Sequence, residues 1–279
     1  DIKKEKLNIL RTAGINRLSI GIQSFENKDL IFMNRSHNAA EAINSIQLAK
    51  ECGFDNISID LIYGVPNQTE SIWKKNLQQM FDLQIDHFSA YALTVEPNTK
   101  LNYLIKKKKI KPLSESKSEN HFKILQEISS EIGYKQYEIS NFCRKDKFAL
   151  HNTSYWEDKI YLGIGPSAHS YNGESRRWNI SNNLKYITFI NSGEKYFDEE
   201  ILSINQKYNE YTLTSLRTIW GVSLDYLENN FDKMITSHFK KNSRKWIENE
   251  NAILENNSLK LTNKGMLFAD AISSDLFII

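Results

Sequence analysis

Apolar and polar positions in the N-terminal half of the chain repeat one order three times: an amphipathic stretch, a glycine and a short apolar run. The glycines precede apolar runs at 16–23, 56–62 and 136–140. Glycine is favoured just beyond a helix, where the chain takes a left-handed conformation before the next strand. A further apolar run follows at 87–94. The pattern predicts four strands and places helices at about 39–52, 70–83 and 116–132, the last with Ser116 and Glu119 as a capping box.

Strands that alternate with helices favour a parallel sheet with right-handed crossovers, so the predicted fold class is α/β. Only about four strands are visible, against eight in a complete barrel of this kind. Residues 1–145 therefore resemble the second half of a TIM-type barrel or an open half-barrel. The first element is a helix at 4–13 with no strand before it, and we expect the chain to start inside a larger fold.

The pattern changes after residue 200, where helical periodicity replaces the alternation. Helices are expected near 206–219, 223–230 and 234–249, followed by a hairpin at 252–261 that turns at Asn256-Asn257. Three helices followed by a hairpin predict a small winged-helix-like α+β domain at 201–279. Residues 146–200 are expected to connect this domain to the half-barrel.

Composition describes an ordinary globular protein. The 279 residues are 40% hydrophobic and carry a formal net charge of +2, which gives no basic field for nucleic acid. A winged-helix nucleic-acid binder is a remote alternative, because its candidate recognition segment at 223–230 is acidic and would repel phosphates. No signal peptide and no run long enough to span a membrane is legible, so a cytoplasmic protein is expected.

Candidate chemistry gathers in two places. Polar residues follow the predicted strands, where the carboxyl edge of a parallel sheet binds ligands: Gln23 and Asp60, with Arg35 in the loop after the first strand. Alternatively, these three residues form a polar network that braces the loops. The second place is 151–170, which reads His-Asn-Thr-Ser-Tyr-Trp and, further on, Gly-Ile-Gly-Pro-Ser-Ala-His-Ser.

The segment at 151–170 combines histidines, aromatic residues and a glycine-rich turn. Imidazole beside Tyr155 and Trp156 suits a flat, apolar ligand better than it suits hydrolysis, for which no triad is legible nearby. The turn at 163–166 is expected to present main-chain N–H groups. The plainer interpretation has His151 bonded to backbone, Tyr155 and Trp156 in the core, and His169 as a structural residue.

Four ordered motifs together carry a resemblance. They are the segments at 14–25 (Gly-Ile-Asn-Arg-Leu-Ser-Ile-Gly-Ile-Gln-Ser-Phe), 59–66 (Ile-Asp-Leu-Ile-Tyr-Gly-Val-Pro), 151–156 and 163–169. In these segments the chain resembles the radical SAM family of oxygen-independent coproporphyrinogen III oxidase-like proteins, and within it the haem-chaperone branch. The resemblance implies that the half-barrel is the C-terminal part of a radical SAM barrel, a partial TIM-type barrel. It also implies that the chain binds haem and delivers it to a haem-accepting protein, with a transient membrane-protein client among the expected partners.

The family's positions carry over residue by residue. The resemblance implies that Gln23, Arg35, Asp60 and Ala92 contact S-adenosylmethionine, that His151 is an axial ligand of haem iron, and that Tyr155 and Trp156 pack on the porphyrin. The family also holds a [4Fe–4S] cluster in a Cys-x-x-x-Cys-x-x-Cys loop, which this chain does not contain. Its cysteines are Cys52, expected to be buried, and Cys143, expected in a loop as a minor candidate for a soft ligand.

One alternative within the same family is an enzyme. Such a protein would decarboxylate the propionates of coproporphyrinogen III with a 5′-deoxyadenosyl radical, as a dehydrogenase of porphyrin biosynthesis. The His-Asn-x-x-Tyr-Trp motif at 151–156 favours the chaperone over this enzyme.

Overall fold

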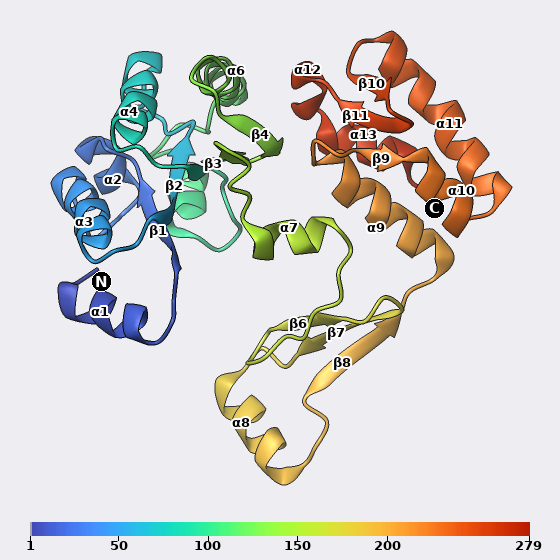
Figure 1. Cartoon of the computed structure of the whole chain (residues 1–279), viewed down its shortest axis with the longest axis horizontal. Coiled ribbons are helices and arrows are strands. Elements are labelled where there is room, and N and C mark those ends of the chain that lie inside the picture. Colours follow the sequence, from blue (N-terminus) through green and yellow to red (C-terminus); the bar gives the residue numbers. More distant parts are fainter. Residues whose placement is uncertain (1) are drawn as a thin grey trace. The chain divides into compact units, whose positions relative to one another are not determined.

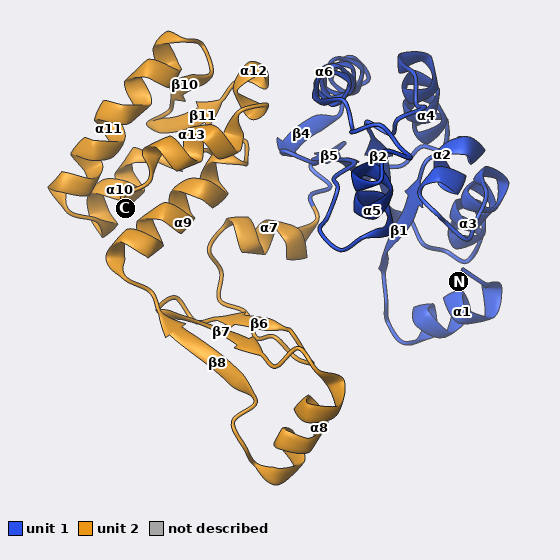
Figure 2. Cartoon of the chain, turned by 180° about the vertical axis from the view of Figure 1, so that it is seen from behind, with its two compact units in different colours: residues 1–148 blue, residues 149–279 orange. Residues whose placement is uncertain are grey.

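The computed structural model describes residues 2–279, which form two compact units (Figure 2). The N-terminal unit ends at Phe148 and the C-terminal unit begins at Ala149. Most of the segment at 146–200, expected to connect two domains, belongs with the C-terminal unit in this division, which assigns only residues 146–148 to the N-terminal unit.

The N-terminal unit alternates helices and strands as its sequence pattern predicts. Its elements are α1 (Lys4–Thr12), β1 (Arg17–Gln23), α2 (Asn27–Phe32), α3 (Ala39–Glu51), β2 (Asn56–Tyr63), α4 (Glu70–Asp82), β3 (His87–Ala92), α5 (Lys100–Lys106), α6 (Glu115–Glu131), β4 (Lys135–Glu138) and β5 (Asn141–Cys143) (Figure 1). Gly14, Gly53 and Gly133 have φ angles of 85°, 82° and 86°, the left-handed conformation expected just beyond a helix. The predicted capping box of Ser116 and Glu119 is wrong, because α6 begins after Ser114, whose hydroxyl accepts from the N–H of Lys117.

The described strands of this unit form one mixed sheet in the order β1-β2-β3-β5-β4. β1, β2 and β3 are parallel, as expected for an α/β fold. The predicted strand at 136–140 is instead a hairpin of two short strands. β5 pairs antiparallel with β3, and β4 pairs antiparallel with β5, so β4 still runs in the direction of the parallel strands.

The two faces of the sheet differ in polarity. On β2, Ile57, Ile59 and Leu61 are buried and alternate with Ser58 and Asp60. The apolar face packs beneath the helices, which supply fully buried side chains such as Trp73 of α4 and Leu125 of α6. Figure 1 shows α3, α4 and α6 along one side of the sheet. The polar face therefore carries the candidate chemistry of this unit.

The C-terminal unit contains two small antiparallel sheets in the described residues. Its elements are α7 (Leu150–Trp156), β6 (His169–Tyr171), β7 (Ser175–Asn179), α8 (Asn183–Ser192), β8 (Phe197–Ile201), α9 (Ile204–Leu216), β9 (Val222–Ser223), α10 (Leu224–Asn230), α11 (Lys233–Glu248), β10 (Ala252–Glu255), β11 (Ser258–Leu261), α12 (Asn263–Met266) and α13 (Ala269–Leu276). One sheet has the order β6-β7-β8 and the other the order β10-β11-β9.

The last eighty residues take the winged-helix-like arrangement that their sequence predicts. α9, α10 and α11 precede the hairpin of β10 and β11, whose turn is at Asn256-Asn257 with φ angles of 49° and 58°. The short strand β9, which the sequence did not indicate, pairs with β11. In the described part of the chain, none of the helices has both the length and the apolar composition needed to cross a membrane.

Candidate functional site

A row of polar positions crosses the polar face of the N-terminal sheet. Register pairs Gly21 with Asp60, Asp60 with Ser89, Ser89 with Asn141, and Asn141 with Glu138. Ser89 Oγ donates to Asn141 Oδ1 at 2.9 Å, and Asn141 Nδ2 donates to Glu138 Oε2 at 2.5 Å. Hydrogen bonds thus link Ser89 to Glu138 through the Asn141 amide, and the register places the Asp60 carboxyl beside Ser89.

Asp60 is a partly exposed member of this row. Burial raises the pKa of its carboxyl, while the hydroxyl of Ser89 and the positive charge of Arg17 act in the opposite direction. A half-buried carboxylate can accept hydrogen bonds from a ligand's hydroxyl or ammonium groups.

Gln23 ends β1 in an unusual conformation. Gly21 pairs with Asp60, but the register then shifts and Gln23 pairs with Leu61. Gln23 has a φ of 68°, in the left-handed region that residues with a side chain rarely adopt. A Cβ atom on Gly21 would lie 2.6 Å from Gln23 Nε2, so the amide is folded back over Gly21. The structure therefore brings the Gln23 amide to the register row of Asp60.

Arg35 lines a cavity of about 390 Å³ in the same unit. Its exposed side chain comes from the loop after α2, and Ile62 of β2 and Leu93, just after β3, line the same cavity. Ile62 follows Asp60 by two residues and so shares its face of the sheet. Leu101 and Leu104 of α5 add apolar lining. The cavity is thus largely apolar, with charged groups from Arg35, Glu96 and Lys100 in its lining, and it lies next to the row that holds Asp60.

Ala92 occupies a different position from the other candidates. It pairs with Tyr63 at the end of β3, whereas Asp60 pairs with Ser89. Because successive strand residues alternate between faces, Ala92 lies on the opposite face from Ser89. Its contact with a cofactor stays a prediction.

His151 and Tyr155 lie one turn apart on α7, in the C-terminal unit. Both side chains are exposed. The rings meet edge-on, with their centroids 5.1 Å apart. Tyr155 also contacts Tyr161, at 4.9 Å between centroids, and Tyr161 contacts Tyr171 at 6.1 Å. An exposed imidazole thus stands at the outer end of a row of tyrosines.

Trp156 is less accessible than Tyr155. Its indole is partly buried, and the guanidinium of Arg217, the residue directly after α9, lies 5.9 Å from the ring centroid. This position gives Trp156 a packing role in the unit. Stacking of its face on a ligand stays a prediction.

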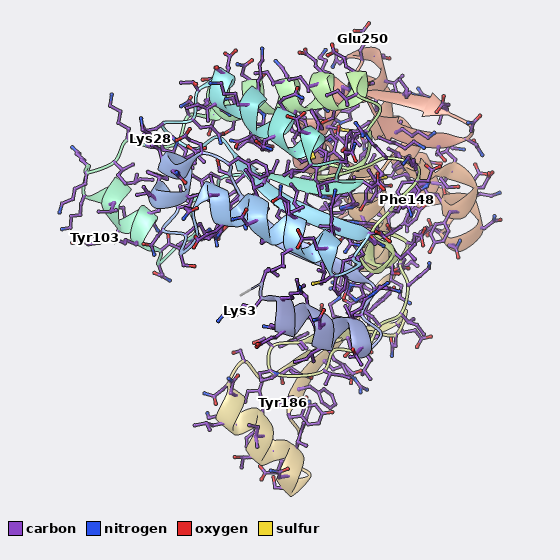
Figure 3. The ribbon with its side chains drawn as sticks, turned by 60° about the vertical axis from the view of Figure 1, so that its left-hand side comes forward. Lys3, Lys28, Tyr103, Phe148, Tyr186 and Glu250 are labelled. Carbon is purple, nitrogen blue, oxygen red and sulfur yellow. The ribbon has the colours of Figure 1, made fainter. Side chains whose placement is uncertain are left out.

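The glycine-rich turn at 163–166 is hydrogen-bonded to side chains of the C-terminal unit, to which it belongs. The N–H of Gly163 donates to Ser170 Oγ at 2.9 Å, and the N–H of Gly165 donates to the hydroxyl of Tyr186 at 3.1 Å. Tyr186 comes from α8, where Figure 3 labels it. These two N–H groups are therefore committed to the fold, contrary to the expectation that the turn presents them to a ligand. His169, on β6, is exposed.

The two cysteines do not form a metal site in the described residues. Cys52 is a partly exposed residue at the end of α3. Cys143 lies in strand β5 and not in a loop; it is 1% exposed, and burial raises the pKa of its thiol to about 11. In residues 2–279, no three His, Cys, Asp or Glu side chains are grouped to hold a metal ion. The residues present therefore do not fit a [4Fe–4S] cluster, which is usually held by several thiolates.

Three polar residues of the site region were not predicted from the sequence. Ser89 and Glu138 complete the polar row, and His87 is buried between the Ser58 hydroxyl at 2.7 Å and the Tyr137 hydroxyl at 2.8 Å. A signal was present, because polar residues at every second position interrupt the apolar runs of β2 and β3. Such alternation indicates a sheet with one polar face.

Comparisons with known proteins place the chain among radical SAM proteins. The family model described as "Radical SAM superfamily" matches residues 1–80. The "Heme chaperone HemW" of Bacillus subtilis is 31% identical over 273 residues, which cover 98% of this chain and 72% of that protein. The "Heme chaperone HemW" of Haemophilus influenzae is 30% identical, over 97% of this chain and 70% of that protein.

A solved structure supports the fold. Coproporphyrinogen III oxidase (HemN) from Escherichia coli, described as a radical SAM enzyme, matches with a TM-score of 0.80 and 23% identity, over 99% of this chain and 67% of that chain. At this identity the match shows the shared architecture alone. The sequence relatives go further, and the chain belongs to the radical SAM family of oxygen-independent coproporphyrinogen III oxidase-like proteins that includes the heme chaperone HemW.

Proposed function

We propose that this protein binds haem through His151 and passes it to a haem-accepting protein. The observation that carries the proposal is the exposed imidazole of His151 on α7, set edge-on against the ring of the exposed Tyr155. Imidazole is a common axial ligand of haem iron, and a tyrosine ring offers apolar surface to a porphyrin. The names of the relatives point to the same cargo. A haem protein is the expected recipient, and a membrane-bound one is included among the candidate clients.

Haem titration of the purified chain tests this proposal. His169→Ala is a matched control, because His169 is also exposed in the C-terminal unit. We expect the Soret band of bound haem to shift or weaken in His151→Ala and to stay unchanged in His169→Ala. Equal spectra and affinities for the parent protein and His151→Ala would contradict ligation by His151. The band position is the decisive readout, because adsorption to an apolar surface also increases absorbance.

We propose, in addition, that the polar face of the N-terminal sheet holds S-adenosylmethionine. Its donor set fits this ligand: Arg35 supplies a guanidinium for the carboxylate, Asp60 accepts from the ribose hydroxyls, and Gln23 can donate or accept. The apolar cavity beside Arg35 offers volume for the remainder of the molecule. When bound, S-adenosylmethionine supplies a sulfonium group and, in radical SAM chemistry, a source of the 5′-deoxyadenosyl radical.

Substitution of the charged groups tests this second site. Asp60→Ala and Arg35→Ala should each weaken S-adenosylmethionine binding by about 10- to 100-fold, because each loses a charged hydrogen bond. Calorimetric titration measures the change. Unchanged affinity in both variants would return these residues to a loop-bracing role.

A further inference from the structure

Four buried polar side chains form a second network beside the candidate cofactor site. Ser24, Asp29, Gln68 and Asn76 are each at most 2% exposed, and we call them the polar hub. Ser24 Oγ and Gln68 Nε2 both donate to Asp29 Oδ2, at 2.9 and 2.8 Å. Asn76 Nδ2 donates to Ser24 Oγ at 3.1 Å. The hub thus joins α2, α4 and the segments that follow β1 and β2.

The hub reaches the backbone at the strained end of β1. Ser24 follows Gln23 directly, and the N–H of Phe25 donates to Asn76 Oδ1 at 2.6 Å. A non-glycine residue persists at positive φ only where its surroundings over-determine it. These contacts therefore account for the conformation that folds the Gln23 amide over Gly21.

The same hub also contacts the segments that carry the two charged candidates, Arg35 and Asp60. Asp29 is part of α2, and the N–H of Arg35 donates to the carbonyl of Leu30 at 2.9 Å, so the loop with Arg35 is attached to the helix that Asp29 anchors. Gln68 Nε2 also donates to the carbonyl of Ile62 at 3.2 Å, two residues beyond Asp60. The Asp29 carboxylate thus connects the segments that carry the three candidate ligand-binding residues, Gln23, Arg35 and Asp60.

A buried carboxylate at position 29 is unfavourable for the stability of the fold. Its Oδ2 accepts both hydrogen bonds of the hub, whereas Oδ1 is buried without a donor among the described residues, as is Gln68 Oε1. Burying a carboxylate with incomplete hydrogen bonding costs free energy, and an apolar residue of similar size would avoid that cost. What the carboxylate does provide is a fixed position for the segments to which it is hydrogen-bonded.

We propose that Asp29 is a positioning residue for S-adenosylmethionine, which fixes Gln23, Arg35 and the end of β2 in the arrangement that binds the ligand. This inference rests on the proposed cofactor site. A purely structural Asp29 would stabilise the fold and leave the affinity for the ligand unchanged, whereas a positioning Asp29 also sets that affinity. Because both hydrogen bonds of the hub go to Oδ2, the positioning role requires one acceptor oxygen and not the second.

Two substitutions of the same residue separate these roles. Asp29→Asn keeps one oxygen to accept from Ser24 and Gln68 and places an amide nitrogen where Oδ1 has no donor. Asp29→Ala removes the acceptor. In calorimetric titrations of the full chain with S-adenosylmethionine, we expect Asp29→Ala to weaken binding roughly tenfold, the loss typical of removing a supporting residue. Asp29→Asn should bind like the parent protein.

Hydrogen exchange gives a readout that needs no ligand. The N–H groups of Phe25 and Arg35 should lose protection together in Asp29→Ala and keep it in Asp29→Asn. If Asp29→Ala fails to fold, Ser24→Ala replaces it, with Ser129→Ala as the control. Ser129 is a buried serine of α6 in the same unit, whose Oγ has no partner among the described residues. Ser24→Ala should weaken binding, and Ser129→Ala should not.

The outcomes distinguish failure of the positioning role of Asp29 from failure of the proposed cofactor site. If Asp60→Ala weakens binding and Asp29→Ala binds like the parent protein, the hub has no positioning role and the proposed cofactor site stands. Loss of binding in Asp29→Asn as great as in Asp29→Ala would also overturn the inference. If the parent protein does not bind S-adenosylmethionine, or Asp60→Ala and Arg35→Ala bind equally well, the proposed site fails and the role assigned to Asp29 fails with it.

Discussion

Tyr155 and His151 are held at right angles, with their ring centroids 5.1 Å apart and their planes at 90°. The two residues are four positions apart on α7, the spacing at which side chains meet on one helix face. Tyr161 then contacts Tyr155 at 76° and 4.9 Å, so the ring beside the imidazole is itself supported. The pair explains how an exposed histidine on a short helix keeps a defined orientation.

Replacement of Tyr155 should change haem binding according to what happens to the ring. Tyr155→Phe keeps the edge-on contact and should bind haem like the parent protein. Tyr155→Leu removes it, and an aromatic pair is worth about 0.5–1.5 kcal/mol, so affinity should fall by roughly two- to tenfold. Absorbance titration with haem compares the two variants. Equal losses in both would assign the effect to the hydroxyl.

The turn at 163–166 provides a test of the C-terminal unit. A Cβ atom on Gly163 would collide with the backbone of His169, which cannot move without breaking the pairing of β6 with β7. Gly163→Ala should lower the free energy of unfolding by about 3 kcal/mol. Gly173→Ala is the control, since Gly173 has a φ of 90° but open space around it, and should cost only about 1 kcal/mol. Similar losses in thermal or urea unfolding would contradict the steric argument.

The chain as given should not assemble an iron–sulfur cluster. Cys143 is enclosed in β5, its thiol pKa is raised to about 11, and Cys52 lies at the end of α3. Both the burial and the raised pKa oppose formation of the thiolate that binds iron. Anaerobic reconstitution followed by iron and sulfide analysis should give no stoichiometric incorporation. Four irons per chain would show that the expectation is wrong.

Periodicity was sufficient to predict the bounds of the long elements, because the signals that define them lie within the elements or directly at their ends. β2 has continuous apolar positions on one face, and α3, α4 and α6 have glycine or capping residues at their ends, so their bounds were predicted within one or two residues. The hairpin of β4 and β5 escaped prediction because its turn at Ile139-Ser140 contains neither glycine nor proline. A three-residue strand is also too short to show alternation.

The residues of the candidate site likewise divide into those that could be predicted from local sequence and those that could not. Gln23, Arg35 and Asp60 could be proposed because Gln23 and Asp60 lie late in predicted strands within recognisable motifs, and Arg35 lies in the loop after the first of these strands. Asp29, Gln68 and Asn76 could not, because no local pattern distinguishes a polar residue that contacts another 39 or 52 positions away from one that faces water. Their importance arises only from tertiary contacts.

His87 gives the last prediction, which concerns acid stability. Burial lowers the pKa of its imidazole from 6.5 to about 3, and the positive charge of Arg17 contributes in the same direction. Below pH 6.5 the unfolded chain binds a proton that the folded chain cannot accept, so the free energy of unfolding falls as the pH falls. One such group gives a limiting slope of about 1.4 kcal/mol per pH unit, present between pH 6.5 and about 3.

Urea unfolding of the parent protein and His87→Gln, measured from pH 7.5 down to pH 5, isolates this contribution. The difference in stability between the two should shrink as the pH falls below 6.5, because the variant has no imidazole to protonate on unfolding. His121→Gln is a necessary comparison, since burial also lowers the pKa of His121. Burial raises the pKa of Asp29 and Asp60, which makes these carboxyls act in the opposite direction, but they are the same in both proteins and cancel in the difference. A difference that stays constant with pH would show that His87 protonates in the folded chain as readily as in the unfolded one, and that burial and the charge of Arg17 do not hold it neutral.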